Sequence, residues 1–339
     1  MMKPWLWRIL LSIFGLLLLL CLGIFLLLWT EIGTQFLFIQ AQQYVPALHV
    51  AQVRGNLLDR LELQGLSYTS SEVNFQSEQT VFVWHSSELL QGKLHLSEFK
   101  LNTAKVKLPP SAPAPQPTEK KPFQKPELPD IKLPLAIQID DISLQKLSIQ
   151  QAEQAPIEIN SINLQASVEN SLNLQKLLID LPQLKAELSG NFGLQAPHAL
   201  NLKLQTSAKL PQVTASGKLE ITGDWQKVKL SSDAEISTPA LPQPTHLHVK
   251  LQSDWEHATL ETLDAKLLDG TLKLTGHAQW LPSLQADLNL TSENLLLTPF
   301  SPQHLPDNFR LNTQLNAALN GQKLLLKQLQ LLAANLQIN

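Results

Sequence analysis

Three places in the 339-residue sequence have residue types and spacing that could do chemistry. His246-Leu247-His248 would put two imidazoles on one face of a strand, but no third metal ligand is evident, so a solvated strand face is the favoured interpretation. Asp140-Asp141 offers two carboxylates, yet successive strand residues point to opposite faces, so the pair predicts a bulge or turn and no acid–base role. Cys21 lies in an apolar run and is interpreted as an apolar filler.

The rest of the sequence gives no sign of an enzyme. It has no Gly-x-Ser-x-Gly elbow, Walker loop, dinucleotide fingerprint or His-Glu-x-x-His motif. A single cysteine excludes intramolecular disulfides and zinc sites of the Cys₄ or Cys₂His₂ type. The net charge is −3 and no Lys/Arg cluster forms a basic stripe, which argues against a nucleic-acid partner. We therefore expect no catalytic residue, no metal and no cofactor.

An uncharged N-terminal run predicts a membrane anchor within residues 1–31. Residues 9–29 form a run of about 21 residues, close to the roughly 20 that cross a bilayer core. A cleaved signal peptide would have a shorter apolar region and small residues before the cut. Lys3 and Arg8 precede the run and Glu31 follows it, so the positive-inside rule puts the N-terminus in the cytoplasm. The residues taken to represent the anchor are Ile9, Leu16, Leu20 and Trp29.

Beyond the anchor the periodicity changes from helical to that of strands. Residues 32–44 fit a short helix that ends before Pro46. Apolar and polar residues then alternate in about 15–18 short runs, the period of a strand with one apolar face. Asn320-Gly321 is a strong hairpin signal. This pattern predicts a mainly β protein with a first β region at 32–108, a Pro-rich linker at 109–134 and a repetitive β region at 135–339.

One short unit recurs along the β-rich part. Residues 89–96 match residues 267–274 in spacing, and each match is interpreted as a strand end, a tight turn and the next strand. Such arrays need polar caps at their ends, but Asn339 comes immediately after a repeat strand. We therefore expect either that the sequence continues in a longer protein or that its last strand pairs with a partner.

The apolar face of such an array must be covered. A second sheet could cover it, as in a β-sandwich, or the sheet could curl into an elongated half-tube whose apolar groove holds lipid chains. The periodicity leaves both possibilities open. The inward-facing aliphatic residues that would line a groove are Leu94, Leu96, Ile137, Ile139, Leu202, Leu204, Leu272 and Leu274. A one-residue slip in register would reverse this assignment.

Several motifs, in this order, resemble the N-terminal part of the TamB family, of the AsmA-like group in Gram-negative bacteria. The anchor is followed by residues 53–66, Val83-Trp84 and residues 88–96. Next come the Pro-rich insertion, residues 133–137, and residues 267–280 with Leu281-Pro282-Ser283-Leu284. The resemblance implies an inner-membrane anchor and a taco-shaped periplasmic β-structure with an apolar groove. It also implies an Omp85-type outer-membrane barrel of the TamA type as partner, engaged by a C-terminal region that this sequence lacks.

The sequence thus leads to two functional hypotheses. The first is a non-enzymatic protein that carries phospholipids between the inner and outer membranes and supports the assembly of outer-membrane proteins and autotransporters, as the resemblance implies. The second is a β scaffold that binds unfolded outer-membrane proteins through open strand edges without lipid transport.

Overall fold

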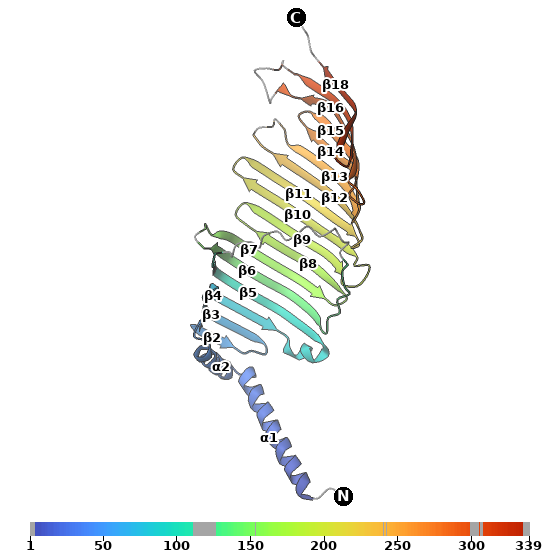
Figure 1. Ribbon diagram of the computed structural model, residues 1–339. Helices are drawn as coiled ribbons and strands as arrows, with labels where there is room; N and C mark the ends of the chain where they lie inside the picture. The colour runs from blue at the N-terminus through green and yellow to red at the C-terminus, as the bar shows by residue number, and fades with distance from the viewer. Residues whose placement is uncertain are drawn as a thin grey trace. The chain divides into compact units, whose positions relative to one another are not determined.

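The computed structural model describes residues 4–110, 127–152, 154–239, 241, 243–298, 305 and 308–334 (Figure 1). About 64% of these residues lie in strands, so the predicted mainly β class is confirmed. The chain divides into two compact units. The first unit comprises Met1–Thr118 and Pro134–Glu169, and the second comprises Glu119–Leu133 and Asn170–Asn339.

The first unit begins with two helices. Helix α1 (Pro4–Trp29) contains a 19-residue stretch, Leu11–Trp29, that is long and apolar enough to span a membrane and is not buried. Helix α2 (Glu31–Tyr44) begins after Thr30, whose hydroxyl accepts a hydrogen bond from the Gly33 N–H at 3.1 Å. A Cβ at Gly33 would overlap the Leu27 carbonyl oxygen, so this corner needs glycine. The apolar run and the short helix that the sequence predicts are both present.

Seven strands form the sheet of the first unit. Strand β3 pairs with β1, β2 and β4, and pairing continues in chain order to β7. Every pair is antiparallel except β5–β6, which is parallel and which the sequence analysis did not anticipate. A 3-10 helix, η1 (Ser86–Gln91), lies between β4 and β5. The strands are β1 (Leu48–His49), β2 (Gln52–Gly55), β3 (Arg60–Thr69), β4 (Asn74–Trp84), β5 (Lys93–Leu108), β6 (Ala136–Gln151) and β7 (Ile157–Val168).

Irregular positions line up across neighbouring strands of this sheet. The pairing of β3 with β4 is interrupted where Gly65 lies opposite Glu78. It is interrupted at the same place in the next two strands, at Thr103 of β5 and Lys146 of β6. Gly65, Thr103 and Lys146 all have positive φ, between +52° and +62°. The register is the same before and after these positions, so no strand gains an extra residue; a residue with positive φ instead interrupts the alternation of the two faces. Apolar side chains return to the same face on both sides of the line, as the three-residue steps show: Leu63 to Leu66, Leu101 to Ala104 and Leu144 to Leu147.

The first unit has two buried clusters, one formed by Val53, Leu61 and Leu63 and the other where β5 and β6 run parallel. Ala104 is fully buried, and Leu101 and Leu147 are nearly so. Partly buried aromatic and aliphatic side chains such as Phe99 and Ile162 pack against this cluster. The cluster therefore stabilises the strand pair that no hairpin joins.

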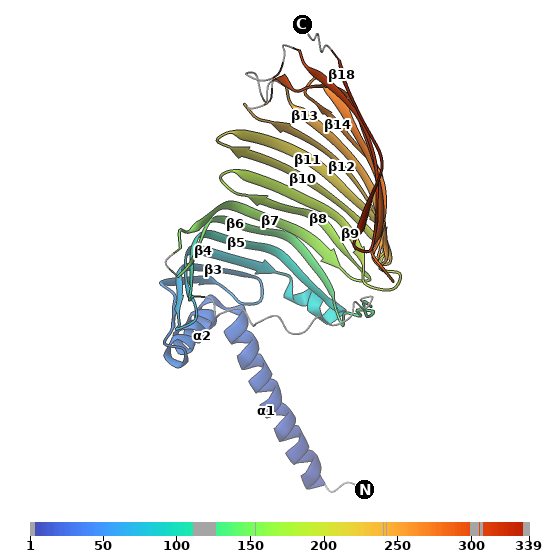
Figure 2. The same ribbon diagram turned by 45° about the horizontal axis from the view of Figure 1, so that its top comes forward.

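Eleven strands form the second unit, and each described pair is antiparallel (Figure 2). The sheet does not close on itself. The hairpin predicted at Asn320-Gly321 is present, but its two turn residues are Gly321 and Gln322, because Asn320 still pairs with Lys323. Gly321 has a φ of +60°, which favours glycine. The strands are β8 (Ser171–Asp180), β9 (Leu184–Gly193), β10 (Leu200–Leu210), β11 (Val213–Gly223), β12 (Lys227–Ser237), β13 (Thr245–Asp254), β14 (His257–Leu267), β15 (Gly270–Gln279), β16 (Gln285–Leu296), β17 (Arg310–Asn320) and β18 (Lys323–Ala334).

The Pro-rich linker is described only in part. Its residues 111–126 lie outside the described residues, and residues 127–133 contain no strand. The domain boundaries drawn from the sequence stay a prediction.

Candidate functional site

The most extensive chemical feature of the second unit is an apolar face that crosses its strands. Apolar side chains face each other from strand to strand: Leu202 pairs with Ile221, and Leu204 pairs with Leu219. Several strand pairs contain a register shift, such as the one between Leu260 and Leu263, but apolar positions still face each other on both sides of it. We define apolar row 1 as the eleven positions Leu177, Leu188, Leu204, Leu219, Ser232, Val249, Leu263, Leu274, Leu290, Leu315 and Leu329. Neighbouring strands lie about 4.8 Å apart, so this row measures about 48 Å along the sheet.

A second row runs beside the first on the same face. Apolar row 2 consists of Leu174, Gly190, Leu202, Ile221, Leu230, Leu251, Leu260, Gly276, Leu288, Ala317 and Leu326. Neither row contains a charged residue. The two rows together form a continuous apolar track across all eleven strands.

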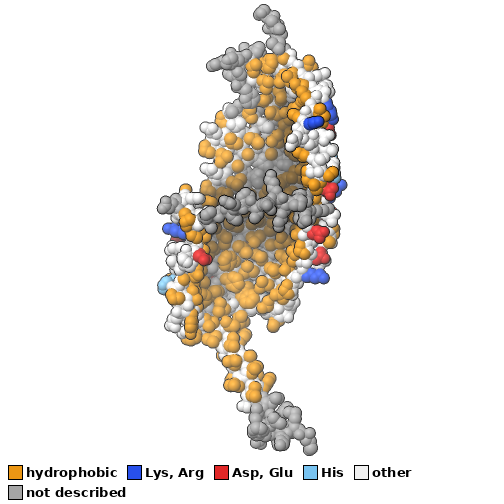
Figure 3. Space-filling model, viewed as in Figure 1, with side chains coloured by type: hydrophobic (Ala, Val, Ile, Leu, Met, Phe, Trp, Pro, Cys, Tyr) orange, Lys and Arg blue, Asp and Glu red, His pale blue; other side chains and the backbone are white. Residues whose placement is uncertain are grey.

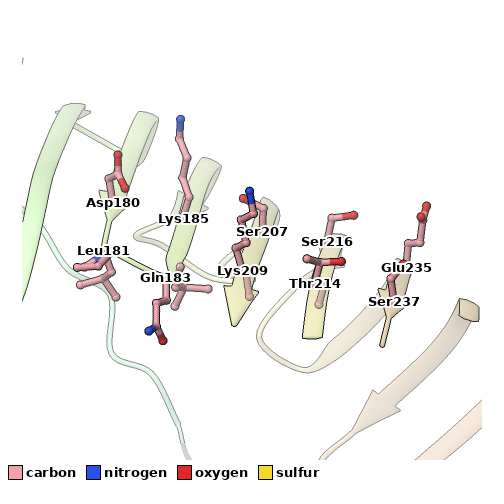
Figure 4. A pocket seen from close by; sticks show the side chains of 14 residues that line it. Asp180, Leu181, Gln183, Lys185, Ser207, Lys209, Thr214, Ser216, Glu235 and Ser237 are labelled. Carbon is pink, nitrogen blue, oxygen red and sulfur yellow. The ribbon is translucent and has the colours of Figure 1, made fainter. Parts of the chain in front are cut away.

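The opposite face of the same strands is polar. Asp180 pairs with Lys185, which pairs with Ser207, and the row continues through Ser216 to Glu235. Figure 4 shows these five side chains standing on the same side of neighbouring strands, where they line a shallow depression. The depression is open and polar, whereas small-molecule sites are mostly apolar and enclosed. We interpret it as part of the solvated face.

The sequence-predicted histidine pair belongs to this polar face. His248 Nδ1 lies 2.6 Å from Asp233 Oδ1, and His246 Nδ1 lies 3.7 Å from Glu235 Oε2. Each imidazole thus faces one carboxylate of β12 across the strand pair β12–β13.

The first unit has an apolar face of its own. Leu94 pairs with Ile137 and Leu96 pairs with Ile139 across the parallel strands β5 and β6. A representative row on this face is Leu61, Phe82, Phe99, Ile142 and Leu164. In Figure 3, hydrophobic side chains cover the visible face of the strands and charged side chains lie at its margins.

The structure places the eight predicted groove residues on the apolar faces of their units. Leu94, Leu96, Ile137 and Ile139 lie together in the first unit. In the second unit, Leu202 and Leu204 lie on β10, and Leu272 and Leu274 lie on β15. Seven of the eight are partly exposed and Leu94 is exposed, so their side chains are accessible from the open face. Contact of these residues with lipid stays a prediction.

The anchor residues lie in α1. Leu16, Leu20 and Trp29 are exposed there, and Ile9 lies in the first part of the helix. Exposed aliphatic and aromatic side chains around a helix of this length are typical of a membrane span.

Sequence reasoning missed a polar cluster in the first unit. His95 Nδ1 lies 2.9 Å from Glu88 Oε1, and His95 Nε2 lies 2.7 Å from Asp140 Oδ2. Burial lowers the pKa of His95, but the hydrogen bonds and charges of the two carboxylates outweigh it and raise the pKa above 6.5. The pKa of Glu88 is lowered, chiefly by its hydrogen bond with His95 and then by Lys93. Burial raises the pKa of Asp140, and the hydrogen bonds with His95 and Gln138 more than reverse this.

The signal for this cluster in the sequence was weak. Asp140-Asp141 does lie at the predicted bulge, where the register with β7 shifts between Ile139 and Ile142. Its partner His95 is 45 positions away, a pairing that depends on the parallel strands β5 and β6.

A second missed feature is a ladder of three tryptophans at the turns of the second unit. The Trp255 indole N–H donates to the Trp225 carbonyl oxygen at 2.9 Å, and the Trp280 indole N–H donates to the Trp255 carbonyl oxygen at 2.7 Å. Asp224 and Asp254 precede two of these tryptophans, and each carboxylate accepts two backbone N–H groups of its own turn. The repeated Asp-Trp pair was the available sequence signal.

We expect Trp255→Phe to destabilise the second unit by about 0.5–1.5 kcal/mol, because it removes one indole hydrogen bond and keeps an aromatic ring. Hydrogen exchange with mass spectrometry should show faster exchange at the β11–β12 and β13–β14 turns. Trp84→Phe is the matched control, because the indole N–H of Trp84 donates to Leu57 O in the first unit. If Trp255→Phe leaves exchange at both turns unchanged, the ladder adds no stability.

The described residues contain eighteen strands, each unit has an apolar face, and one described helix is long and apolar enough to span a membrane. The chain is therefore a mainly β protein with a helix that can span a membrane. The family model described as "TamB, N-terminal domain" matches three overlapping stretches: residues 19–126, 113–217 and 213–339. The chain therefore belongs to this family, which confirms the resemblance. Neither the curated proteins nor the solved structures gave a match to the chain.

Proposed function

We propose that the chain is a non-enzymatic carrier of phospholipids between the inner and outer membranes. The observation that supports the proposal most directly is the continuous apolar track formed by rows 1 and 2. An acyl chain gains about 0.8 kcal/mol for each CH₂ group that it buries. Because the track changes little from one strand to the next, a lipid that moves along it exchanges one set of aliphatic contacts for a similar set. No chemical step is needed for such movement.

The setting of this function follows from the helix and the family. In our proposal α1 crosses the inner membrane with the N-terminus in the cytoplasm, so that the strands lie in the periplasm. The Lys3 and Arg8 charges, which precede the apolar stretch Leu11–Trp29, support this orientation. Membership of the family supports an outer-membrane partner of the TamA type, reached through a C-terminal region, and a role in the assembly of outer-membrane proteins and autotransporters.

Native mass spectrometry of the whole chain, purified from bacterial membranes in mild detergent, tests the proposal. Lipid extraction of the same sample identifies what is bound. We expect co-purifying phospholipid that survives detergent exchange. A folded protein free of lipid would contradict the carrier function.

A second candidate function rests on strand β18. Its Leu324 and Leu332 side chains are 73% and 65% exposed, and within the described part of the chain only β17 pairs with it. An open, apolar strand edge can bind an extended peptide by strand addition. Photo-cross-linking from β18 to unfolded outer-membrane proteins, in a sample without lipid, would favour this scaffold function.

A further inference from the structure

Three side chains with metal-binding atoms converge near the start of the parallel strand pair β5–β6. His85 immediately precedes η1, Glu88 lies within η1, and His95 is the third residue of β5. One ligand atom from each of the three lies within 4.8 Å of the other two. The His85 and His95 ring centroids are 4.6 Å apart, and the His85 backbone N–H donates to the His95 carbonyl oxygen at 2.9 Å. The backbone therefore fixes the two histidines next to each other.

The surroundings orient His95 as a ligand. Asp140 Oδ2 lies 2.7 Å from His95 Nε2, and the Gln138 amide donates to the other Asp140 oxygen at 2.7 Å. A carboxylate that accepts the N–H of one ring nitrogen fixes the tautomer and leaves the other nitrogen to a metal. In this cluster that other nitrogen is Nδ1, which faces Glu88 Oε1 at 2.9 Å.

Glu88 can serve as a ligand without losing its other contact. Lys93 Nζ lies 3.0 Å from Glu88 Oε2, so the lysine occupies one carboxylate oxygen and leaves Oε1 directed at His95. His85 is exposed, and its ring can turn toward the other two ligands.

We propose that His85, Glu88 and His95 bind one divalent transition-metal ion, with Asp140 as the carboxylate that orients His95. Two imidazoles and one carboxylate suit zinc best, with water as the fourth ligand of a tetrahedral site. Binding replaces the proton on His95 Nδ1, which is released to solvent, while the Nε2 proton stays hydrogen-bonded to Asp140. Tetrahedral ligands at roughly 2.0–2.1 Å from zinc lie about 3.3 Å apart, so the three side chains must draw together by about 1.5 Å at most. The ion would fasten η1 to the start of β5, where β5 meets β6.

The test is a zinc titration of the whole chain in detergent by calorimetry, after removal of bound metal with a chelator. We expect one zinc ion per chain, and at least tenfold weaker binding for both His85→Ala and Glu88→Gln. Asp140→Asn should weaken binding by about 10–100-fold, as for other residues that orient a metal ligand. X-ray absorption of the zinc complex should show nitrogen and oxygen ligands at about 2.0–2.1 Å.

His49→Ala and His248→Ala are the matched controls. His49 is an exposed histidine of β1 in the same unit, and His248 belongs to the histidine pair of the polar face. Neither substitution should change the affinity. Binding that is lost in His248→Ala and kept in His85→Ala would place the ion on the polar face and overturn the assignment. Absence of zinc binding at about 100-fold excess over micromolar protein would overturn it as well.

Discussion

Leu272→Asp is expected to remove co-purified phospholipid from the protein while leaving it folded and inserted in the membrane. Leu272 lies on the apolar face of β15, between Ala265 of β14 and Ser292 of β16. An ionised carboxylate there either stays hydrated, so that water replaces the acyl chain at this position, or is desolvated by the acyl chain. Its desolvation would cost several kcal/mol of binding free energy. A loss of 1.4 kcal/mol already reduces affinity tenfold, so we expect at least a tenfold decrease in bound lipid by native mass spectrometry.

The fold should tolerate this change because Leu272 is only partly buried. Leu274→Asp, two residues further along the same face and in row 1, should have the same effect. Two independent positions guard against an effect peculiar to one side chain.

Thr271→Asp is the matched control. It introduces the same charge into the same strand one residue away, but Thr271 pairs with Lys266 and Glu293 on the polar face and is exposed. We expect its lipid content to equal that of the unchanged protein. Equal lipid loss in Thr271→Asp and Leu272→Asp would show that charge in general, and not the apolar face, controls binding. Full lipid content in folded Leu272→Asp would remove this residue from the lipid path.

Much of the fold was predictable because alternation reports directly on a strand with two unlike faces. The run 200–204 predicted β10 and put Leu202 and Leu204 on one face, which the pairing with Ile221 and Leu219 confirms. The short helix α2 and the hairpin turn after Asn320 followed from equally local signals. Register then extended the local pattern into rows, since each hairpin fixes its own pairing.

Other features depend on contacts that no local pattern encodes. Alternation is the same in parallel and antiparallel strands, so the parallel pair β5–β6 could not be distinguished. Residues 89–91 were interpreted as a strand end by analogy with residues 267–269, but they lie in η1, which ends at Gly92 with a φ of +77°. The cluster around His95 needs both of these features, and this is why the sequence pointed to His246 and His248 and not to His95.

Leu147→Ala is expected to cost the first unit about 2–5 kcal/mol of unfolding free energy, the range for removing a buried leucine side chain. Leu147 is 8% exposed and pairs with fully buried Ala104 across the parallel strands. Removing its side chain leaves a cavity beside Leu101 and Ile159, which belong to the same cluster. Urea unfolding in detergent, followed by circular dichroism, should show a lower midpoint.

Ile157→Ala is the control for this prediction. Ile157 pairs with Ile149 in the hairpin of β6 and β7, but it is 61% exposed, so its removal should change stability by no more than about 0.5 kcal/mol. A similar loss for both variants would mean that the cluster around Ala104 stabilises this unit no more than an exposed position does.

The region of faster hydrogen exchange in Leu147→Ala should also be larger than after an ordinary core substitution. Antiparallel neighbours joined by a hairpin keep their register through the turn, whereas parallel strands need a long crossover connection. The register of β5 and β6 therefore depends on packing at positions such as Leu147. We expect Leu147→Ala to speed hydrogen exchange along the whole of β5 and β6.

Leu295→Ala, at a 9% exposed position of β16 in the second unit, should affect only its immediate neighbours, because β16 has antiparallel partners on both sides. Equally local exchange in both variants would show that the parallel pair holds its register without this side chain.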